Sequence, residues 1–204
     1  MNSAKLRAKR DLIRRTYREL EQPATLVALC EQYLKLDPLD GIVWAWCGHS
    51  LIELARYGEA RAALQTARGL VTTDDQVAFV LRCSGDFEQS QGRYQEAKAL
   101  YRETIDLAPV YDSAWIAFGR AAFSLGEIDA AEDAFRKAAS LNGSFSGTAL
   151  YELGRVLRTR GAFFEARRTL KQATHLIPGD ERVESVLADV DRAIRVKSKA
   201  ADAS

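Results

Sequence analysis

The sequence predicts an all-α protein built from about five helical hairpins in a row, closed by one further helix at the C-terminal end. The first observation is a recurrence of glycines, because Gly85, Gly119 and Gly154 stand 34 and 35 residues apart. The second is that another glycine follows each of them seven residues later. These second glycines are Gly92, Gly126 and Gly161. A motif that recurs every roughly 20–50 residues indicates a solenoid, in which each unit packs on its neighbours.

Each second glycine is followed by the same succession of side chains. An alanine comes five residues later, a large residue four after that and a small residue three after that. In chain order, the alanines are Ala97, Ala131 and Ala166, the large residues Tyr101, Phe135 and Leu170, and the small residues Thr104, Ala138 and Ala173. A glycine without a side chain lets the two helices of a hairpin approach closely, and a second glycine permits the tight turn between them. A proline after the second helix ends the unit.

These residues resemble the tetratricopeptide repeat, whose pattern runs W-x2-L-G-x2-Y, then A-x3-F, then P over roughly 34 residues. The fullest match comprises Trp115, Phe118, Gly119, Ala131 and Phe135. Three other stretches match with substitutions, such as Leu150 in the Trp slot, Ser84 in the Leu slot and Thr72 in the proline slot. The resemblance covers about residues 7 to 180. It implies a right-handed superhelical solenoid of about five tetratricopeptide hairpins plus a C-terminal capping helix.

We expect a single array over residues 1–196 and a flexible tail at 197–204. The units run over 41–74, 78–111, 112–146 and 147–180, after a degenerate first unit at about 7–40. In that first unit Arg14 and Glu21 stand where the two glycines belong, and Asp75 to Val77 lengthen the junction before the third unit. A capping helix at 181–196 is predicted from apolar residues at helical spacing. They are Val183, Val186, Leu187, Val190 and Ile194.

Composition narrows the class of protein. Lys plus Arg number 29 and Asp plus Glu 28, so no global excess of charge indicates a nucleic-acid partner. Cys30, Cys47 and Cys83 fit no disulfide or zinc spacing, which predicts reduced, packed thiols in a cytoplasmic protein. No apolar run approaches the roughly 18 residues that a membrane span needs.

The first twenty residues are basic and poor in acids. The basic residues are Lys5, Arg7, Lys9, Arg10, Arg14, Arg15 and Arg18. We expect this segment to be the first helix of the array, with a solvated basic face. The alternatives are a face that binds an acidic protein, a membrane or nucleic acid, and an organellar transit peptide.

No motif in the sequence predicts catalysis. His49 and His175 lie in different repeats, and neither has a motif neighbour. The sequence contains no H-E-x-x-H, Gly-rich phosphate loop, G-x-S-x-G or EF-hand loop. We therefore expect a protein that is not an enzyme and has no cofactor and no metal site.

The resemblance implies that the first helix of each hairpin lines a concave groove. The candidate partner-binding residues of this groove are Trp46, His49, Phe79, Arg82, Asp86, Arg120, Phe123, Tyr151, Arg155 and Arg158. Trp46 is the leading candidate for an exposed anchor, because Trp44 already takes the core slot and aromatic residues dominate interface hot spots. The alternative is that Trp46 packs on the helices of the first unit.

The candidates include a row of four arginines, Arg82, Arg120, Arg155 and Arg158. This row predicts a partner segment that is acidic or ends in a carboxylate. The alternative is that Asp86 and Glu152 simply pair with the arginines. Family members that bind chaperones hold a Glu-Glu-Val-Asp tail in a clamp of Lys, Asn, Asn, Lys and Arg. The clamp slots here contain Ala45, His49, Cys83, Ser113 and Ala117, so we do not expect that partnership.

Together these patterns predict a non-catalytic scaffold or assembly chaperone that binds a peptide or helix of another protein in its groove. The first alternative is a structural protein that assembles into homo-oligomers. The second is a regulatory subunit of an enzyme.

Overall fold

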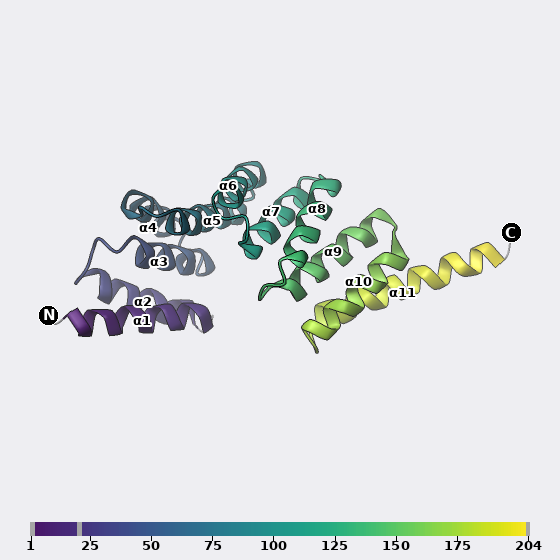
Figure 1. The fold of residues 1–204 in the computed structure, drawn as a ribbon, viewed down its shortest axis with the longest axis horizontal. Helices are drawn as coiled ribbons and strands as arrows, with labels where there is room; N and C mark the ends of the chain where they lie inside the picture. The colour runs from purple at the N-terminus through teal and green to yellow at the C-terminus, as the bar shows by residue number, and fades with distance from the viewer. Residues whose placement is uncertain (1–2, 20–21, 203–204) are drawn as a thin grey trace. The chain divides into compact units, whose positions relative to one another are not determined.

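The computed structural model describes residues 3–19 and 22–202, and the side chains up to residue 198. The described residues form eleven α-helices and contain no strand, which confirms the all-α class (Figure 1). The helices fall into two compact units, residues 1–108 and 109–204, and each is described by itself. The continuous array expected from the sequence therefore stays a prediction.

The first unit contains three helical hairpins. The helices are α1 (Ser3–Glu19), α2 (Pro23–Leu34), α3 (Gly41–Glu53), α4 (Tyr57–Leu70), α5 (Asp74–Ser90) and α6 (Tyr94–Leu107). Each hairpin packs on the next, because α3 contacts α1 and α2, and α5 contacts α3 and α4. The degenerate first hairpin thus folds like the others, although Arg14 replaces its first glycine; Glu21, in the second glycine slot, lies outside the described residues.

The second unit contains two hairpins and a last helix. Its helices are α7 (Asp112–Ser124), α8 (Ile128–Ser140), α9 (Ser146–Arg160), α10 (Phe163–Leu176) and α11 (Glu181–Asp202). The last helix packs on α10 and α9, as expected of a cap. It runs six residues beyond the predicted end at 196, so most of the expected tail is helical. No proline or glycine lies between Asp180 and Asp202 to end the helix. The remaining tail residues, 203–204, lie outside the described part.

The two kinds of glycine act as the sequence predicts. A methyl group added at Gly85 would lie 2.4 Å from Cε1 of Tyr101, and one at Gly119 would lie 2.7 Å from Cε1 of Phe135. These positions therefore let the large residue of the second helix pack against the backbone of the first. In the turns, the φ angles of Gly92, Gly126 and Gly161 are 73°, 78° and 83°. Glycine adopts this left-handed conformation without the cost that a Cβ brings.

One junction differs from the prediction. Asp75, Gln76 and Val77, expected to lengthen a loop, instead belong to the first turns of α5, which begins at Asp74. The side chain of Thr73 accepts a hydrogen bond from the backbone N–H of Gln76 at 3.4 Å, and Asp74 and Asp75 lie in the first turn. A Thr cap and acidic residues stabilise a helix start, because they satisfy free N–H groups and complement the helix dipole.

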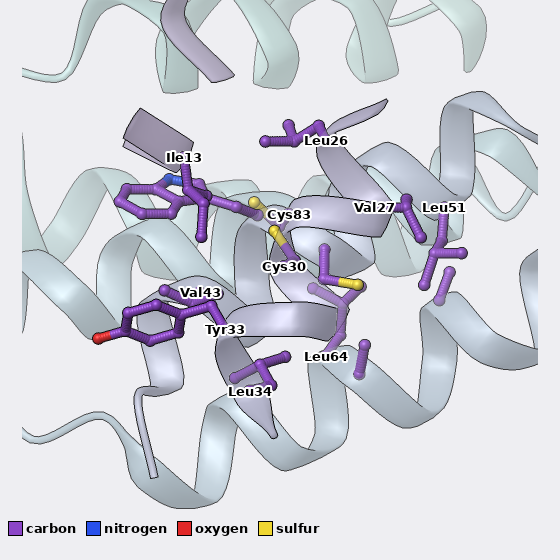
Figure 2. Close-up of a cluster of buried hydrophobic side chains, with 14 of the residues drawn as sticks. Ile13, Leu26, Val27, Cys30, Tyr33, Leu34, Val43, Leu51, Leu64 and Cys83 are labelled. Atoms are coloured by element: carbon purple, nitrogen blue, oxygen red, sulfur yellow. The ribbon is translucent and has the colours of Figure 1, made fainter. Parts of the chain in front are cut away.

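The core of the first unit draws on all three of its hairpins. Ile13 of α1, Cys30 and Tyr33 of α2, Leu51 of α3 and Cys83 of α5 are buried in one cluster (Figure 2). All three cysteines are free and buried, as predicted. The core is continuous from the degenerate hairpin onwards, so α1 is an integral part of the unit. Within the described residues, no helix combines the length and the apolar character that crossing a membrane requires.

Candidate functional site

Trp46 lies in the core and not on an exposed face. Its exposed fraction is 7%, and its ring centroid lies 5.8 Å from that of Tyr17 on α1. The prediction of an exposed anchor is therefore wrong, and the alternative that Trp46 packs on the first hairpin is confirmed. The roles of the two tryptophans are exchanged, because α1 covers the side of α3 that carries Trp46.

Trp44, assigned to the core slot from the sequence, is only half-buried. Its indole Nε1 donates to the carbonyl of Pro38 at 2.8 Å, and its ring lines a groove of about 480 Å³ between α2 and α4. Leu34, Leu51 and Ala63 contribute apolar surface to the same groove. Trp115 makes the equivalent bond to the carbonyl of Pro109, at 2.9 Å. A tryptophan in this slot therefore fixes the start of its helix to the preceding junction.

Three of the predicted residues meet around one carboxylate in the first unit. The Asp86 carboxylate accepts hydrogen bonds from Arg82, one turn earlier on α5, and from the hydroxyl of Tyr101 on α6 at 2.8 Å. Nε2 of His49 on α3 lies 3.5 Å from the same carboxylate. We call His49, Arg82, Asp86 and Tyr101 the Asp86 cluster. Its groups come from three helices, so the cluster joins two hairpins of the unit.

The Asp86 cluster holds its charges away from solvent. The side chains of Arg82, His49 and Asp86 are 13%, 17% and 21% exposed. Burial opposes ionisation of Asp86, but the charge of Arg82 and the hydrogen bonds from His49 and Tyr101 outweigh it, so the pKa of Asp86 lies below its usual range. Burial and the Asp86 charge raise the pKa of Tyr101. The ionised carboxylate is therefore the resting state of the cluster.

Aromatic rings cover the exposed side of this cluster. Tyr17 of α1 accepts a hydrogen bond from Arg82 at 3.2 Å, and its ring lies 5.5 Å from that of His49 and 5.8 Å from that of Phe79. The Arg82 guanidinium lies 5.3 Å from the Phe79 ring centroid. Sequence reasoning did not select Tyr17 as a site residue, because the repeat pattern assigns it to the packed stripe of the first helix and does not show which residues it meets. It also treated Tyr101 only as a core residue.

The second unit places two arginines on one buried carboxylate. Glu152 of α9, with a side chain 5% exposed, accepts from Arg120 Nε on α7 at 2.8 Å and from Arg155 Nη1 at 2.7 Å. The arginine side chains remain 42% and 36% exposed. The predicted pairing of Glu152 with arginines is thus confirmed, but one acid serves two bases. This arrangement leaves one net positive charge at the surface.

Two aromatic rings pack against one of these arginines, Arg155. The Arg155 guanidinium lies 5.5 Å from the ring centroid of Phe123 and 5.8 Å from that of Tyr151. Arg182 of α11 lies 5.4 Å from the centroid of Tyr151. We call Arg120, Phe123, Tyr151, Glu152 and Arg155 the arginine face, which lies on α7 and α9. An arginine stacked on rings keeps its planar donors fixed in place, ready to bind a carboxylate or phosphate.

The last predicted arginine does not join this face. Arg158 pairs through Nη1 with Asp189 of α11 at 2.9 Å. It therefore helps to attach the capping helix to α9. The four predicted arginines thus pair with three different acids: Arg82 with Asp86, Arg120 and Arg155 with Glu152, and Arg158 with Asp189. Arg182, which no sequence pattern indicated, contacts the arginine face through the ring of Tyr151.

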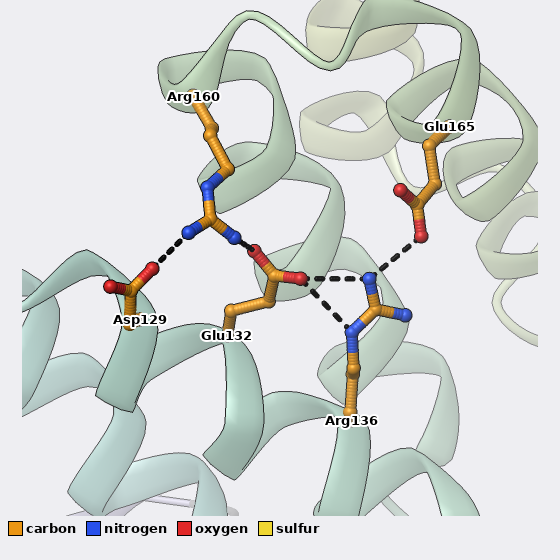
Figure 3. A network of polar contacts seen from close by, with 5 residues as sticks. All are labelled: Asp129, Glu132, Arg136, Arg160 and Glu165. Atoms are coloured by element: carbon orange, nitrogen blue, oxygen red, sulfur yellow. Dashed lines mark hydrogen bonds and ion pairs between the residues drawn. The ribbon is translucent and has the colours of Figure 1, made fainter.

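A second buried acid lies elsewhere in the second unit and serves the fold. Glu132 of α8 is 8% exposed and accepts hydrogen bonds from Arg136 at 2.8 Å and from Arg160 at the end of α9 (Figure 3). Arg136 also donates a hydrogen bond to Glu165 of α10 at 2.7 Å, and Arg160 also donates one to Asp129. The network links three consecutive helices, and its acids outnumber its arginines.

Known proteins resemble this chain over most of its length. A search finds 26% identity to the human Cilia- and flagella-associated protein 70 over 167 residues, which are 80% of this chain and 14% of that protein. The chain thus spans about one seventh of that relative. A tetratricopeptide protein from Thermus thermophilus superposes with a TM-score of 0.71 at 18% identity, covering 91% of this chain and 98% of the other. The first tetratricopeptide domain of Spaghetti (RPAP3), bound to an HSP90 peptide, superposes with a TM-score of 0.58 at 25% identity, covering 60% and 99%.

Family models give the assignment directly. Two models, each described as tetratricopeptide repeat, match residues 69–144 and 116–181. Together they span more than half of the 204 residues. With the paired glycines and the helical hairpins described above, these matches show that the chain belongs to the tetratricopeptide repeat family.

Proposed function

We propose that the protein is a non-catalytic scaffold whose arginine face binds an acidic segment of a partner protein. The tetratricopeptide fold supports a protein-interaction scaffold in general. The observation that carries the specific proposal is the sharing of Glu152 by Arg120 and Arg155, each more than one third exposed. A partner carboxylate can take over one arginine while Glu152 keeps the other, so binding leaves no buried charge unpaired.

Phe123 supplies the apolar part of the contact, whereas Tyr151, predicted to line the groove, is buried at 9% exposure and supports the arginines from below. Phe123 is half-buried next to Arg155, and Tyr151 lies between Arg155 and Arg182. Arginine and tyrosine are the residue types enriched among interface hot spots. We therefore place the contact on α7 and α9, and we propose an extended segment with acidic residues next to an apolar one.

A similar domain supports this class of ligand. The Spaghetti (RPAP3) domain was solved with the HSP90 peptide SRMEEVD, which carries three acidic residues. The clamp residues expected for such a tail are replaced here, and two of the replacements, Ala45 and Cys83, are buried at 0% exposure. We therefore propose a different acidic sequence, bound by arginines of the second unit. We place the protein in the cytoplasm, where thiols such as its three free cysteines stay reduced.

The test uses the full chain and two short synthetic peptides. One peptide carries four glutamates and one leucine, and the other has glutamine in place of each glutamate. Titration at low salt should show binding of the acidic peptide alone. The double variant Arg120→Ala with Arg155→Ala should weaken binding about tenfold or more, because it removes both charged donors.

Arg168→Ala provides the matched control, because Arg168 is an exposed arginine of α10 that makes no ion pair with any described residue. This variant should bind like the wild type. Circular dichroism checks that each variant keeps its helices. Equal binding of the glutamine peptide, or unchanged binding by the double variant, would refute the assignment of this face.

A further inference from the structure

The helix α1 carries a one-sided charge. It contains seven Lys and Arg residues and two acids, whereas the whole chain has a net charge of +1. Only Arg10 uses its charge inside the unit, because it pairs with Asp40, the residue that caps α3. The other six are exposed and make no ion pair with any residue that the structure describes. They are Lys5, Arg7, Lys9, Arg14, Arg15 and Arg18.

The apolar residues of α1 are already used by the fold. Ile13 is 1% exposed in the core, and Leu6 and Tyr17 pack against the same cluster. In the described part of the first unit α1 packs on α2 and α3, and Tyr17 also reaches Arg82 and Phe79 of α5, so the side of α1 away from these helices is open (Figure 1). Leu12, at 47% exposure, is the one large apolar side chain there. The open side therefore offers charge and a small amount of apolar surface.

The charges on this open side follow helical spacing. Arg7, Arg14 and Arg18 are separated by seven and four residues, so they form one row along the helix. Lys5 and Lys9, four residues apart, lie along the opposite margin. The exposed alanines Ala4 and Ala8 lie between the two margins, followed by Asp11 and Arg15. The open side therefore begins with two small residues and continues with charged ones, between two basic margins that can select an acidic partner.

A polar outer side of a helix does not require such a one-sided charge. The helix α11 caps the second unit with five acids and five bases along its length. A polar outer side is thus achieved there with balanced charge. The helix α1, by contrast, has a net charge of +5.

We propose that the open side of α1, lined by Arg7, Arg14, Arg18, Lys5 and Lys9, binds an acidic helix of another protein that packs along it. Both helices rise about 1.5 Å per residue, so glutamates at spacings of four and seven residues on the partner match the two basic margins. Ala4 and Ala8 leave room for the partner helix beside the first turns of α1. This surface is separate from the arginine face and does not depend on it.

The open side is less suited to a membrane or to nucleic acid. A helix that lies in a membrane interface inserts its apolar face, and that face of α1 is packed in the core. Binding of single-stranded nucleic acid relies on exposed rings that stack on bases. The ring of Tyr17, the single aromatic residue of α1, is engaged with Trp46, His49 and Phe79.

The experiment measures binding of the full chain to a labelled 18-residue peptide kept helical by a side-chain lactam. Its glutamates flank an alanine stripe, and a second peptide has the same composition in scrambled order. We expect the patterned peptide to bind at least about tenfold more tightly than the scrambled one, and its affinity to fall about tenfold or more between 50 and 300 mM salt. Equal affinity for the two peptides would overturn the proposal.

Charge-reversal variants assign the surface. Arg7→Glu, Arg14→Glu and Arg18→Glu together should abolish binding without loss of helicity, because all three side chains are exposed. Reversal of Arg168, Arg195 and Lys197 to Glu in the second unit should leave binding within about twofold. Unchanged binding by the α1 variant would refute the proposal. So would tighter binding to vesicles containing phosphatidylserine, or to a single-stranded RNA 20-mer, than to the patterned peptide.

Discussion

The two units carry different charges at the same position of the repeat. The residue that follows the first glycine of a repeat is His49 and Asp86 in the first unit, and Arg120 and Arg155 in the second. In the first unit the two residues contact each other, and Asp86 gathers Arg82 and Tyr101 around itself. In the second unit the two residues repel each other and share Glu152. The residue after the first glycine therefore determines whether the charged groups of a unit pair with one another or remain exposed to solvent.

Because of this difference, we expect the Asp86 cluster to contribute to stability and the arginine face to binding. The Asp86 cluster is buried, and Tyr17 covers Arg82, so its interactions contribute mainly to folding. The arginine face leaves its guanidinium groups more than one third exposed, so little folding energy depends on them. Homologous positions of one repeat can thus be used as a fold determinant in one unit and as a candidate binding site in the next.

Replacing the central acid of each unit, Asp86 or Glu152, tests this comparison most directly. Asp86→Ala should lower the free energy of unfolding by about 3 kcal/mol, because it removes the acid that pairs with the mostly buried Arg82 and leaves the buried Tyr101 hydroxyl without its acceptor. Glu152→Ala should cost less, about 1–2 kcal/mol, because Arg120 and Arg155 can turn towards water. Urea denaturation followed by circular dichroism measures both. Asp106→Ala, at an exposed acid of α6 without an ion pair to any described residue, should change the stability by less than about 0.5 kcal/mol.

The close contacts of Gly85 and Gly119 provide a second comparison between the two units. Gly85→Ala should destabilise by roughly 3 kcal/mol and Gly119→Ala by roughly 1–2 kcal/mol. The Tyr101 ring next to Gly85 is held by its bond to Asp86, whereas the Phe135 ring next to Gly119 has no hydroxyl to restrain it. Thermal melts of the two variants test this order. Gly69→Ala in α4 meets no atom within 4 Å and should stabilise by about 0.5 kcal/mol. The explanation fails if Gly119→Ala proves the more damaging variant.

The turn of the second hairpin differs from the later turns, including the turn at Gly92 in the same unit. Ala55 occupies the turn slot of the second hairpin with a φ of 57°, where the second unit has Gly126 and Gly161. Ala55→Gly should raise the free energy of unfolding by about 0.5–1 kcal/mol, because a left-handed φ is unfavourable for a residue with a Cβ. Ala62→Gly, in the interior of α4, should lower it by about 1 kcal/mol. Denaturant midpoints of the two variants would contradict this account if they moved in the same direction.

The smallest expected effect is a dependence on acid pH. The pKa of Asp86 is lower in the folded state, so its ionised form contributes stability that is present above its unfolded pKa of about 4. That stability is lost as the pH falls through the lower folded pKa. The effect is modest, because burial opposes the charges that favour ionisation. The difference in stability between wild type and Asp86→Asn should therefore be constant from pH 5 to 7 and shrink below about pH 4. A constant difference down to pH 3 would show that ionisation of Asp86 does not matter.

Most of the fold could be predicted because local spacing determines it. The glycines, the alanines and the large residues that meet the glycines identify each hairpin without reference to distant parts of the chain. The early start of α5 was also readable, since Thr73 with Asp74 and Asp75 is a helix-start signal. The length of α11 was missed because its last residues are polar, and polarity was taken as a sign of fraying.

The sites were harder to predict, because they depend on which helices meet. Trp44 and Trp46 stand two residues apart, and their burial is decided by the position of α1, which the repeat pattern does not fix. Arg82 and Arg120 look alike in sequence, yet Tyr17 covers the first, from 65 residues away. The pairing of Glu152 with two arginines was foreseen as an alternative, since acids and bases on facing helices attract each other.

The network around Glu132 bears on how the second unit unfolds. Its arginines come from α8 and α9 and its acids reach α10, so detaching α10 removes Glu165 from Arg136. In a repeat protein the end hairpins open most easily, and the coupling between neighbours sets how far the opening spreads. The network strengthens that coupling where α8, α9 and α10 meet. Amide hydrogens of α9 and α10 should therefore exchange together, as one cooperative block, instead of fraying hairpin by hairpin.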